Sequence, residues 1–306
     1  MNRQFIFKKK KFKITNGIYQ FDILSPDTNL VKDFYYNKPF PNYSSSDNKY
    51  TILEKGNKNY LAKRFKKEIG YNKNILEVGS GTSQLSLYFG IGTNNNIFAL
   101  DGALKSLMLG KEFANLHNIK NVQFVNADLL DDIFQDEIFD FVWCSGVLHH
   151  TRDPYNGFVN IVKKLKKNGI VLVGLYNKFF RIRTIVRKYF YKIFGEKIIF
   201  IFDPYLRKLK KDYNKNIEKI NAWINDQYKH PIESTHSYGE CMKWFSNNDI
   251  EYISSIPNLD TSSNFYLFKK SEAPNIFKRF FIQLSMPFTK YGGEGGLFVM
   301  IGKKNN

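Results

Sequence analysis

Cysteine and long apolar runs are both scarce in this chain of 306 residues. The two cysteines, Cys144 and Cys241, exclude a disulfide framework and a cysteine-rich zinc site, and they suit a reducing compartment. No segment approaches the roughly twenty apolar residues of a membrane span, and the basic N-terminus lacks the apolar stretch of a signal peptide. The sequence therefore predicts a cytoplasmic protein, with peripheral contact to a membrane left open.

Acidic residues are also few. The chain has 28 Asp and Glu against 46 Lys and Arg, which gives a formal net charge of +18. A surplus of this size attracts anionic partners such as nucleic acid, anionic lipid or an acidic substrate. The abundance of Lys and Asn can equally reflect coding bias, so the charge alone does not select a partner.

The most informative stretch runs from Asn74 to Ser83 and reads NILEVGSGTS. A short apolar strand leads into a turn with two glycines, Gly79 and Gly81, whose missing side chains allow a ligand to approach the backbone. The helix expected after the turn would offer free N–H groups and a positive dipole end. This layout predicts a nucleotide-like ligand at the carboxyl edge of a parallel sheet.

Two common nucleotide-binding motifs fit this turn poorly. The dinucleotide pattern G-x-G-x-x-G ends on a glycine or alanine, where this chain has Gln84. No segment matches the phosphate-binding pattern G-x-x-x-x-G-K-[ST]. The ligand must therefore be inferred from the residues that follow the turn.

Four more apolar runs follow the turn and alternate with helical segments. Asp101 ends the first of these runs, twenty residues beyond Gly81, and Asp128 comes shortly after the next. Because strands that alternate with helices form βαβ units, the pattern predicts a parallel sheet. The runs are Ile97 to Leu100, Val122 to Val125, Phe139 to Cys144 and Ile170 to Tyr176.

An acid, a spacer and G-x-G at 77–81, followed in order by Asp101 and Asp128, resemble the class I, Rossmann-like methyltransferases that depend on S-adenosyl-L-methionine (SAM). The likeness is to the bacterial type-11 and type-12 groups and covers Leu61 to Tyr176. It implies an α/β fold with a seven-stranded, mostly parallel sheet, helices on both faces and a final antiparallel pair. That pair is expected at Glu251 to Ile256 and Leu297 to Ile301.

The resemblance implies SAM as the cofactor. In this family the acid after the second strand binds the ribose and the acid after the third binds the adenine amino group, which here are Asp101 and Asp128. The family usually has a third glycine near position 83, and Ser83 is expected to cap the following helix instead. The predicted cofactor-binding residues are Glu77, Gly79, Ser80, Gly81, Asp101, Gly102, Asp128, Leu129 and Ser145.

The acceptor pocket of such folds lies above the ends of the fourth and fifth strands. A histidine there can take a proton near neutral pH, which makes His149 and His150 the candidate bases, with a packing role as the alternative. Histidines and acids at 226–236 are too loosely spaced for a metal site, so no metal is predicted. The predicted substrate residues are Tyr43, Tyr176, Asn177, Arg181, Tyr228, His230 and His236.

The chain is expected to divide into four regions. The first contains a hairpin around Asn16-Gly17 and an aromatic, proline-rich segment at 33–50 that is predicted to cover the ligand cleft. The regions are 1–50, the hairpin and lid segment; 51–176, the SAM-binding core; 177–235, a basic helical insertion after the fifth strand; and 236–306, the rest of the core with its last two strands.

The insertion carries much of the positive charge. Residues 178–219 contain thirteen Lys or Arg and four Asp or Glu, with aromatic and branched residues between them. A basic amphipathic helix of this kind can cap the active site with its apolar face inward, lie on an anionic membrane surface, bind nucleic acid or join two copies of the chain. The sequence leaves all four open.

These features together predict an enzyme that transfers a methyl group from SAM to an unidentified small-molecule or lipid-like acceptor. The positive charge makes an RNA or protein methyltransferase the first alternative. A SAM-binding protein without catalysis is the second, because neither histidine is an obvious base. The oligomeric state is left open.

Overall fold

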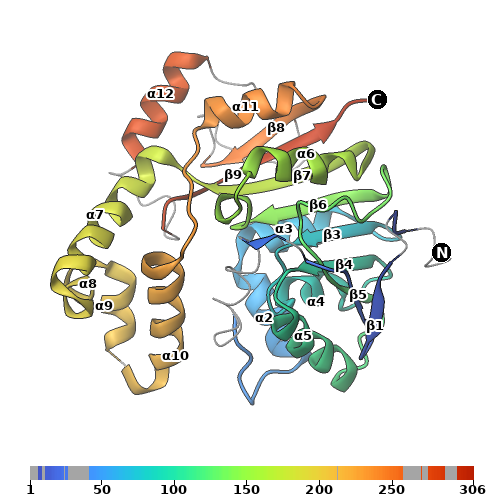
Figure 1. The fold of residues 1–306 in the computed structure, drawn as a ribbon, viewed down its shortest axis with the longest axis horizontal. Helices are drawn as coiled ribbons and strands as arrows, with labels where there is room; N and C mark the ends of the chain where they lie inside the picture. Colours follow the sequence, from blue (N-terminus) through green and yellow to red (C-terminus); the bar gives the residue numbers. More distant parts are fainter. Residues whose placement is uncertain are drawn as a thin grey trace.

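A nine-stranded sheet organises the chain in the computed structural model, which describes residues 6–8, 11–23, 25–26, 41–211, 213–257, 270, 275–286 and 295–306. In spatial order its strands are β1 (Lys13–Thr15), β2 (Ile18–Gln20), β5 (Val122–Asn126), β4 (Asn96–Asp101), β3 (Asn74–Val78), β6 (Phe139–Ser145), β7 (Leu165–Tyr176), β9 (Leu297–Lys304) and β8 (Ile250–Ile256) (Figure 1).

Strand direction follows the expectation for a Rossmann-like core. All neighbouring pairs from β2 to β7 are parallel, whereas β9 lies antiparallel between β7 and β8. The predicted final antiparallel pair is therefore confirmed. Because the parallel strands all end at one edge, the loops that follow them meet there.

The N-terminal hairpin changes the strand count. Asn16 and Gly17 both have positive φ, as a tight hairpin turn requires, and β1 pairs with β2 around them. β2 continues the sheet by pairing in parallel with β5, so that Ile18 lies opposite Phe124. The prediction of a hairpin is confirmed, but the sheet has nine strands rather than seven because the hairpin joins its edge.

Helices cover both faces of this sheet (Figure 1). One face carries aromatic and aliphatic side chains from helices on either side of the glycine turn, and the other carries side chains from two later helices. The first set is α2 (Lys49–Lys58), α3 (Tyr60–Glu68), α4 (Gln84–Gly90) and α5 (Leu104–Leu116); the second is α6 (Pro154–Lys163) and α11 (Tyr238–Ser246).

Ahead of β3 the chain forms two helices, α2 and α3, where one continuous helix could have run. Asn59 interrupts it with an extended backbone at ψ 106°, and its side chain accepts a hydrogen bond from the Ala62 N–H at 3.1 Å. Asparagine competes for backbone donors in this way and so favours helix ends over helix interiors. The apolar periodicity runs through both helices, which is why the sequence pattern alone did not indicate the break.

The insertion after β7 is helical, as predicted. It has a small apolar cluster of its own that includes Ile199, Leu206 and Ile220. A separate helix, α12 (Ile276–Ser285), lies beside its first helix, and none of the helices in the described ranges is long and apolar enough to cross a bilayer. The insertion's helices are α7 (Lys178–Phe194), α8 (Glu196–Phe202), α9 (Pro204–Lys210), α10 (Tyr213–Ile224) and a π-helical turn (Asn225–Lys229).

Candidate functional site

A cavity of about 1300 Å³ lies at the carboxyl ends of the parallel strands. The loops after β3, β4, β5 and β6 form its floor, and α10 and residues 41–47 contribute to its walls. Ligand pockets commonly measure roughly 300–1000 Å³, so this cavity has room for a cofactor and an acceptor together. Every residue predicted to bind the cofactor lines it: Glu77, Gly79, Ser80, Gly81, Asp101, Gly102, Asp128, Leu129 and Ser145.

The glycine turn is tightly built. Gly79 has φ +68°, and a Cβ at this position would lie 2.2 Å from Cγ2 of Val147 in the loop after β6. A side chain here would therefore clash with that loop as well as strain the backbone. The turn brings the ends of β3 and β6 together at the cavity floor.

The N–H groups of this turn are not available to a ligand. Those of Gly79 and Ser80 both donate to the Leu100 carbonyl, at 2.8 and 3.0 Å, and that of Gly81 donates to Oδ2 of Asp101 at 2.7 Å. The prediction of free N–H groups concerned the start of the following helix, α4, and these three hydrogen bonds do not test it. Such a turn does not suit a phosphate, but SAM has no phosphate and carries a positive sulfonium.

Ser83 does not act as predicted. Its backbone is left-handed at φ 61°, and its side chain makes no capping hydrogen bond to α4; the hydroxyl instead lies 3.2 Å from that of Ser80. A left-handed position favours glycine, which explains in physical terms why a glycine is usual there. The prediction of a serine cap is therefore corrected.

Two carboxylates stand at neighbouring strand ends. Oδ1 of Asp101 accepts the Ala103 N–H at 2.7 Å, and Oδ1 of Asp128 accepts the Leu130 N–H at 2.9 Å. Burial raises the pKa of Asp101, although the N–H groups of Ala103 and Gly81 oppose that shift. A carboxylate can accept several hydrogen bonds, so both side chains retain the capacity to accept a ligand's hydroxyl or amino group.

Glu77 is a third acid, and it is fully buried below the turn. The Ser86 hydroxyl donates to its Oε2. Burial raises the pKa of Glu77 to about 8, because the charged form loses hydration. The side chain is therefore mostly protonated at neutral pH, and a cation bound in the cavity would favour its ionised form.

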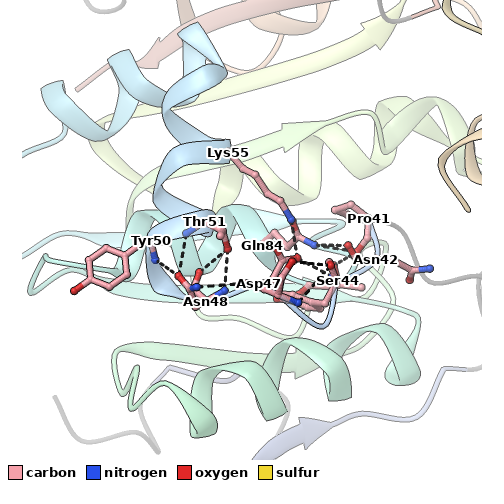
Figure 2. A network of polar contacts seen from close by, with 12 residues as sticks. Pro41, Asn42, Ser44, Asp47, Asn48, Tyr50, Thr51, Lys55 and Gln84 are labelled. Carbon is pink, nitrogen blue, oxygen red and sulfur yellow. Dashed lines mark hydrogen bonds and ion pairs between the residues drawn. The ribbon is translucent and has the colours of Figure 1, made fainter. Parts of the chain in front are cut away.

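Residues 41–47 form one wall of the cavity, and a polar network links them to the start of α2 (Figure 2). Nε2 of Gln84 donates to the Asn42 carbonyl at 3.1 Å, and Lys55 on α2 pairs with Asp47 at 2.7 Å. These contacts attach the segment to α2 and α4. Tyr35, Tyr36, Pro39 and Phe40, which belong to the predicted lid, lie outside the described residues.

Tyr43 is fixed within this wall. Its hydroxyl donates to the Thr82 carbonyl at 2.8 Å, and its ring stacks on Phe113 with centroids 4.8 Å apart. Burial strongly raises the pKa of its hydroxyl, so Tyr43 stays protonated. It lines the cavity and presents an aromatic surface beside the glycine turn.

Only one of the two candidate bases lines the cavity, and that is His150. Its Nδ1 lies 2.7 Å from the Ile232 carbonyl. A carbonyl can only accept, so Nδ1 carries the proton and Nε2 is the unprotonated nitrogen. Burial lowers the pKa of His150 to about 4, which makes it neutral at pH 7 and only a weak base.

His149 has the packing role. It is fully buried, it stacks on Tyr176 with centroids 3.8 Å apart, and neither ring nitrogen has a hydrogen-bond partner among the described residues. Burial lowers its pKa well below the ordinary value, and repulsion from His150 in its protonated form adds to this. The structure therefore does not place His149 where it could take a proton from an acceptor.

A buried ion pair joins the insertion to the core beside the cavity. Arg181 is 0% exposed and binds Glu233 through two nitrogens, at 2.9 and 2.8 Å, and its guanidinium lies 3.7 Å from the Tyr176 ring centroid. Although burial opposes it, the hydrogen bonds and charge of Arg181 lower the pKa of Glu233 to about 2. The pair is therefore ionised and holds Tyr176 in place.

Two of the seven predicted substrate residues, Tyr43 and Tyr176, line the cavity. The others support the walls rather than line them. Asn177 caps α7, Tyr228 donates to Asp203 at 2.7 Å, and His230 stacks on His150 with centroids 3.6 Å apart. Arg181 belongs to the ion pair, and His236 lies between Ser234 and Glu240, with both contacts at 2.8 Å.

Sequence reasoning missed the outer part of the cavity. α10 contributes Lys219 and Trp223, the π-helical turn after it contributes Asp226, and the loop before α6 contributes Arg152. Lys219 and Trp223 are spaced at i and i+4, so they share one face of α10. That spacing was visible in the sequence, but nothing local indicated that this face would meet the cofactor pocket.

The donor set fits SAM better than a metal. No cluster of His, Cys, Asp and Glu suited to a metal ion occurs in the part of the chain that the structure describes. The cavity instead combines carboxylates from Asp101 and Asp128 with open space at Gly146, where a Cβ would meet no atom within 4 Å. This arrangement suits an uncharged sugar and base attached to a cation.

Comparisons with known proteins agree with this geometry. Residues 76–173 match the family model described as "Methyltransferase domain". The phosphoethanolamine N-methyltransferase 2 of Caenorhabditis elegans is 32% identical over 33% of this chain and 22% of that protein. The ubiquinone biosynthesis O-methyltransferase of Rickettsia bellii (strain OSU 85-389) is 25% identical over 44% of this chain and 57% of its own length.

Solved structures extend the likeness of the fold beyond this segment. The magnesium protoporphyrin IX methyltransferase of Synechocystis PCC 6803, solved with bound SAH, superposes with a TM-score of 0.53 over 92% of this chain and 100% of that one, at 11% identity. At this identity the likeness shows the fold alone. The segment from residue 76 to residue 173 is thus a methyltransferase domain, and it is built on the Rossmann-like fold of the class I, SAM-dependent methyltransferases.

Proposed function

We propose that this chain is a SAM-dependent methyltransferase that acts on a small-molecule or lipid-like acceptor. One observation carries the proposal: a single cavity of about 1300 Å³ contains the glycine turn and acids expected to hold SAM, and it continues to His150, Tyr176 and α10. SAM fills only part of such a volume. The remaining space, between the ends of β6 and β7 and the insertion, is proposed to receive the acceptor.

The cofactor would be held by the floor of the cavity. Asp101 would accept hydrogen bonds from the ribose hydroxyls, and Asp128 would accept one from the adenine amino group. SAM, when bound, supplies an activated methyl group that is transferred by in-line substitution. The chain's own residues then need to align the acceptor and exclude water more than to activate the donor.

His150 would orient the acceptor and receive its proton. Its unprotonated Nε2 can accept a hydrogen bond from an acceptor hydroxyl or amine. Because its pKa is about 4, it deprotonates only acidic acceptors effectively. The outer wall adds aromatic surface from Trp223 and positive charge from Arg152, which would suit a partly apolar acceptor with an acidic group.

A labelled-methyl assay tests the function. With a lipid and small-molecule extract as the acceptor source, methyl label from SAM should enter a product of low molecular mass. Label that enters only RNA or protein would reject the proposed acceptor class and support the alternative that the charge suggests. SAH binding without any transfer across these sources would instead support a non-catalytic SAM-binding protein.

A further inference from the structure

The insertion lies on the side of the molecule away from β1 to β5 (Figure 1). It carries exposed apolar side chains that form a surface. This surface lies on three helices that adjoin one another: Phe190 of α7 stacks with Phe202 of α8, and Phe179 of α7 contacts Phe280 of α12. We call it the outer apolar surface. Its residues are Ile182, Ile185, Val186, Tyr189, Phe190, Ile193, Phe194, Ile201, Phe202, Ile276, Phe277, Phe280, Phe281 and Leu284.

The pattern on α7 is that of an amphipathic helix turned outward. Ile182, Ile185 and Ile193 belong to a stripe at i, i+3 and i+11 and are 50%, 47% and 54% exposed. The opposite side of the helix packs on the core through Phe180 and Thr184. The apolar stripe therefore does not close the active site, which was one of the expectations for this insertion.

Positive charge accompanies this surface. α7 has six Lys or Arg and no acidic residue, and α12 has Lys278 and Arg279 and no acidic residue. Lys192 and Lys197 are exposed beside the apolar side chains. Glu196 at the start of α8 is the one acidic residue of the three helices, and it is exposed. Apolar side chains flanked mainly by cations match an anionic bilayer, where the former enter the acyl boundary and the latter meet the phosphates.

We propose that the outer apolar surface docks the protein onto an anionic lipid membrane. In the part of the chain that the structure describes, the outer apolar surface and the cavity lining share no residue. Docking would therefore leave the cofactor site accessible. The proposal goes beyond methyl transfer and does not depend on it, because docking is measured without cofactor. It adds a surface from which a lipid-like acceptor could reach the enzyme.

Sedimentation of the full chain with lipid vesicles tests the proposal. We expect binding to vesicles of phosphatidylcholine with phosphatidylglycerol, much weaker binding to phosphatidylcholine alone, and loss of binding at high salt. The double variant Ile185→Ser/Ile193→Ser should lower the partition coefficient at least about tenfold. Lys192→Glu/Lys197→Glu should lower it by about tenfold or more.

Matched controls separate the surface from general charge and hydrophobicity. Met108 and Leu116 on α5 are two exposed apolar residues with the same i, i+8 spacing, and Lys63 and Lys120 are exposed on the core. Met108→Ser/Leu116→Ser and Lys63→Glu/Lys120→Glu should bind vesicles as the parent chain does. All variants should keep the parent's circular dichroism and SAH affinity.

Several results would overturn the proposal. Equal binding to neutral and anionic vesicles would show that anionic lipid is not what the surface recognises. Equal losses of binding in the surface and control variants would show that the outer apolar surface is not the part that contacts the membrane. No vesicle binding together with a dimer that Ile185→Ser/Ile193→Ser dissociates would make the surface an interface between copies. No vesicle binding together with RNA binding that Lys192→Glu/Lys197→Glu abolishes would make it a nucleic-acid site.

Discussion

Two helices of this chain, α6 in the core and α7 in the insertion, have similar amphipathic patterns and opposite surroundings. α6 buries Phe158, Ile161 and Val162 against the sheet, whereas the corresponding stripe of α7 faces outward. Periodicity therefore shows that a helix has an apolar side, but not what covers that side. In the core the partner is the sheet, and in the insertion we propose that it is a membrane.

The largest expected effect on stability comes from a substitution where the insertion joins the core. Arg181→Ala removes one member of a buried ion pair and leaves Glu233 with Lys188 as its remaining cation. Loss of one partner in such a pair typically costs about 3–5 kcal/mol. Urea unfolding should show this loss, while Lys192→Ala on the exposed side of α7 should change stability by less than about 0.5 kcal/mol.

Equal stabilities for these two variants would contradict the comparison, because they would mean that Arg181 does not connect the insertion to the core. The stability of the parent chain at acidic pH gives a second test of this ion pair. The depressed pKa of Glu233, about 2, contributes stability above the unfolded value near 4.5 that is lost as the pH falls toward 2. Arg181→Ala should weaken this pH dependence.

A second prediction concerns the core alone. Asp101→Ala should weaken SAH binding by about 1–3 kcal/mol, because buried hydrogen bonds to the ribose are lost. Isothermal titration calorimetry measures this, with the exposed Asp22→Ala as the control. An unchanged affinity in Asp101→Ala would show that the ribose lies elsewhere.

A third prediction uses the buried acid below the turn. The pKa of Glu77 is raised to about 8 in the folded chain from 4.5, so the folded state holds an extra proton between these values. This contributes stability that is present below pH 4.5 and is lost as the pH rises through 8. Glu77→Gln should lose less stability than the parent between pH 7 and pH 9, by on the order of 1 kcal/mol. Identical slopes in thermal unfolding would contradict the buried, protonated state.

The smallest expected effect on stability comes from the exposed stripe of α7, and it is compared with a buried position of the core. Ile185→Ser replaces an apolar side chain that is 47% exposed and should change the free energy of unfolding by less than about 0.5 kcal/mol. Leu172→Ala, at a fully buried position of β7, should cost about 2–5 kcal/mol. A large loss of stability in Ile185→Ser would show that the α7 stripe is covered within the protein.

The cofactor half of the site could be predicted from the sequence, and the acceptor half could not. Gly79 directly follows β3, Asp101 is the last residue of β4 and Asp128 lies two residues after β5, so local pattern places them at one edge of the sheet. Trp223 and Arg152 reach the same cavity from elements far apart in the chain. Their meeting depends on how the insertion packs on the core, and no periodicity records that packing.

Backbone detail was also beyond the sequence pattern. The internal hydrogen bonds of Gly79 and Ser80 depend on the Leu100 carbonyl, and Ser83 has a left-handed backbone that its residue type does not indicate. Asn59 likewise divides a periodic segment through one side-chain hydrogen bond. Each of these hydrogen bonds is a single contact, whereas the strand and helix patterns rest on many residues.

A crystal structure of the chain with SAH tests the central claim most directly. We predict that the adenosyl group lies against the Gly79–Gly81 turn, with the ribose hydroxyls within hydrogen-bond distance of Asp101 and the adenine amino group near Asp128. The thioether sulfur should face the space beside His150 and Tyr176. SAH bound elsewhere, or a structure in which this floor remains empty at saturating SAH, would contradict the account.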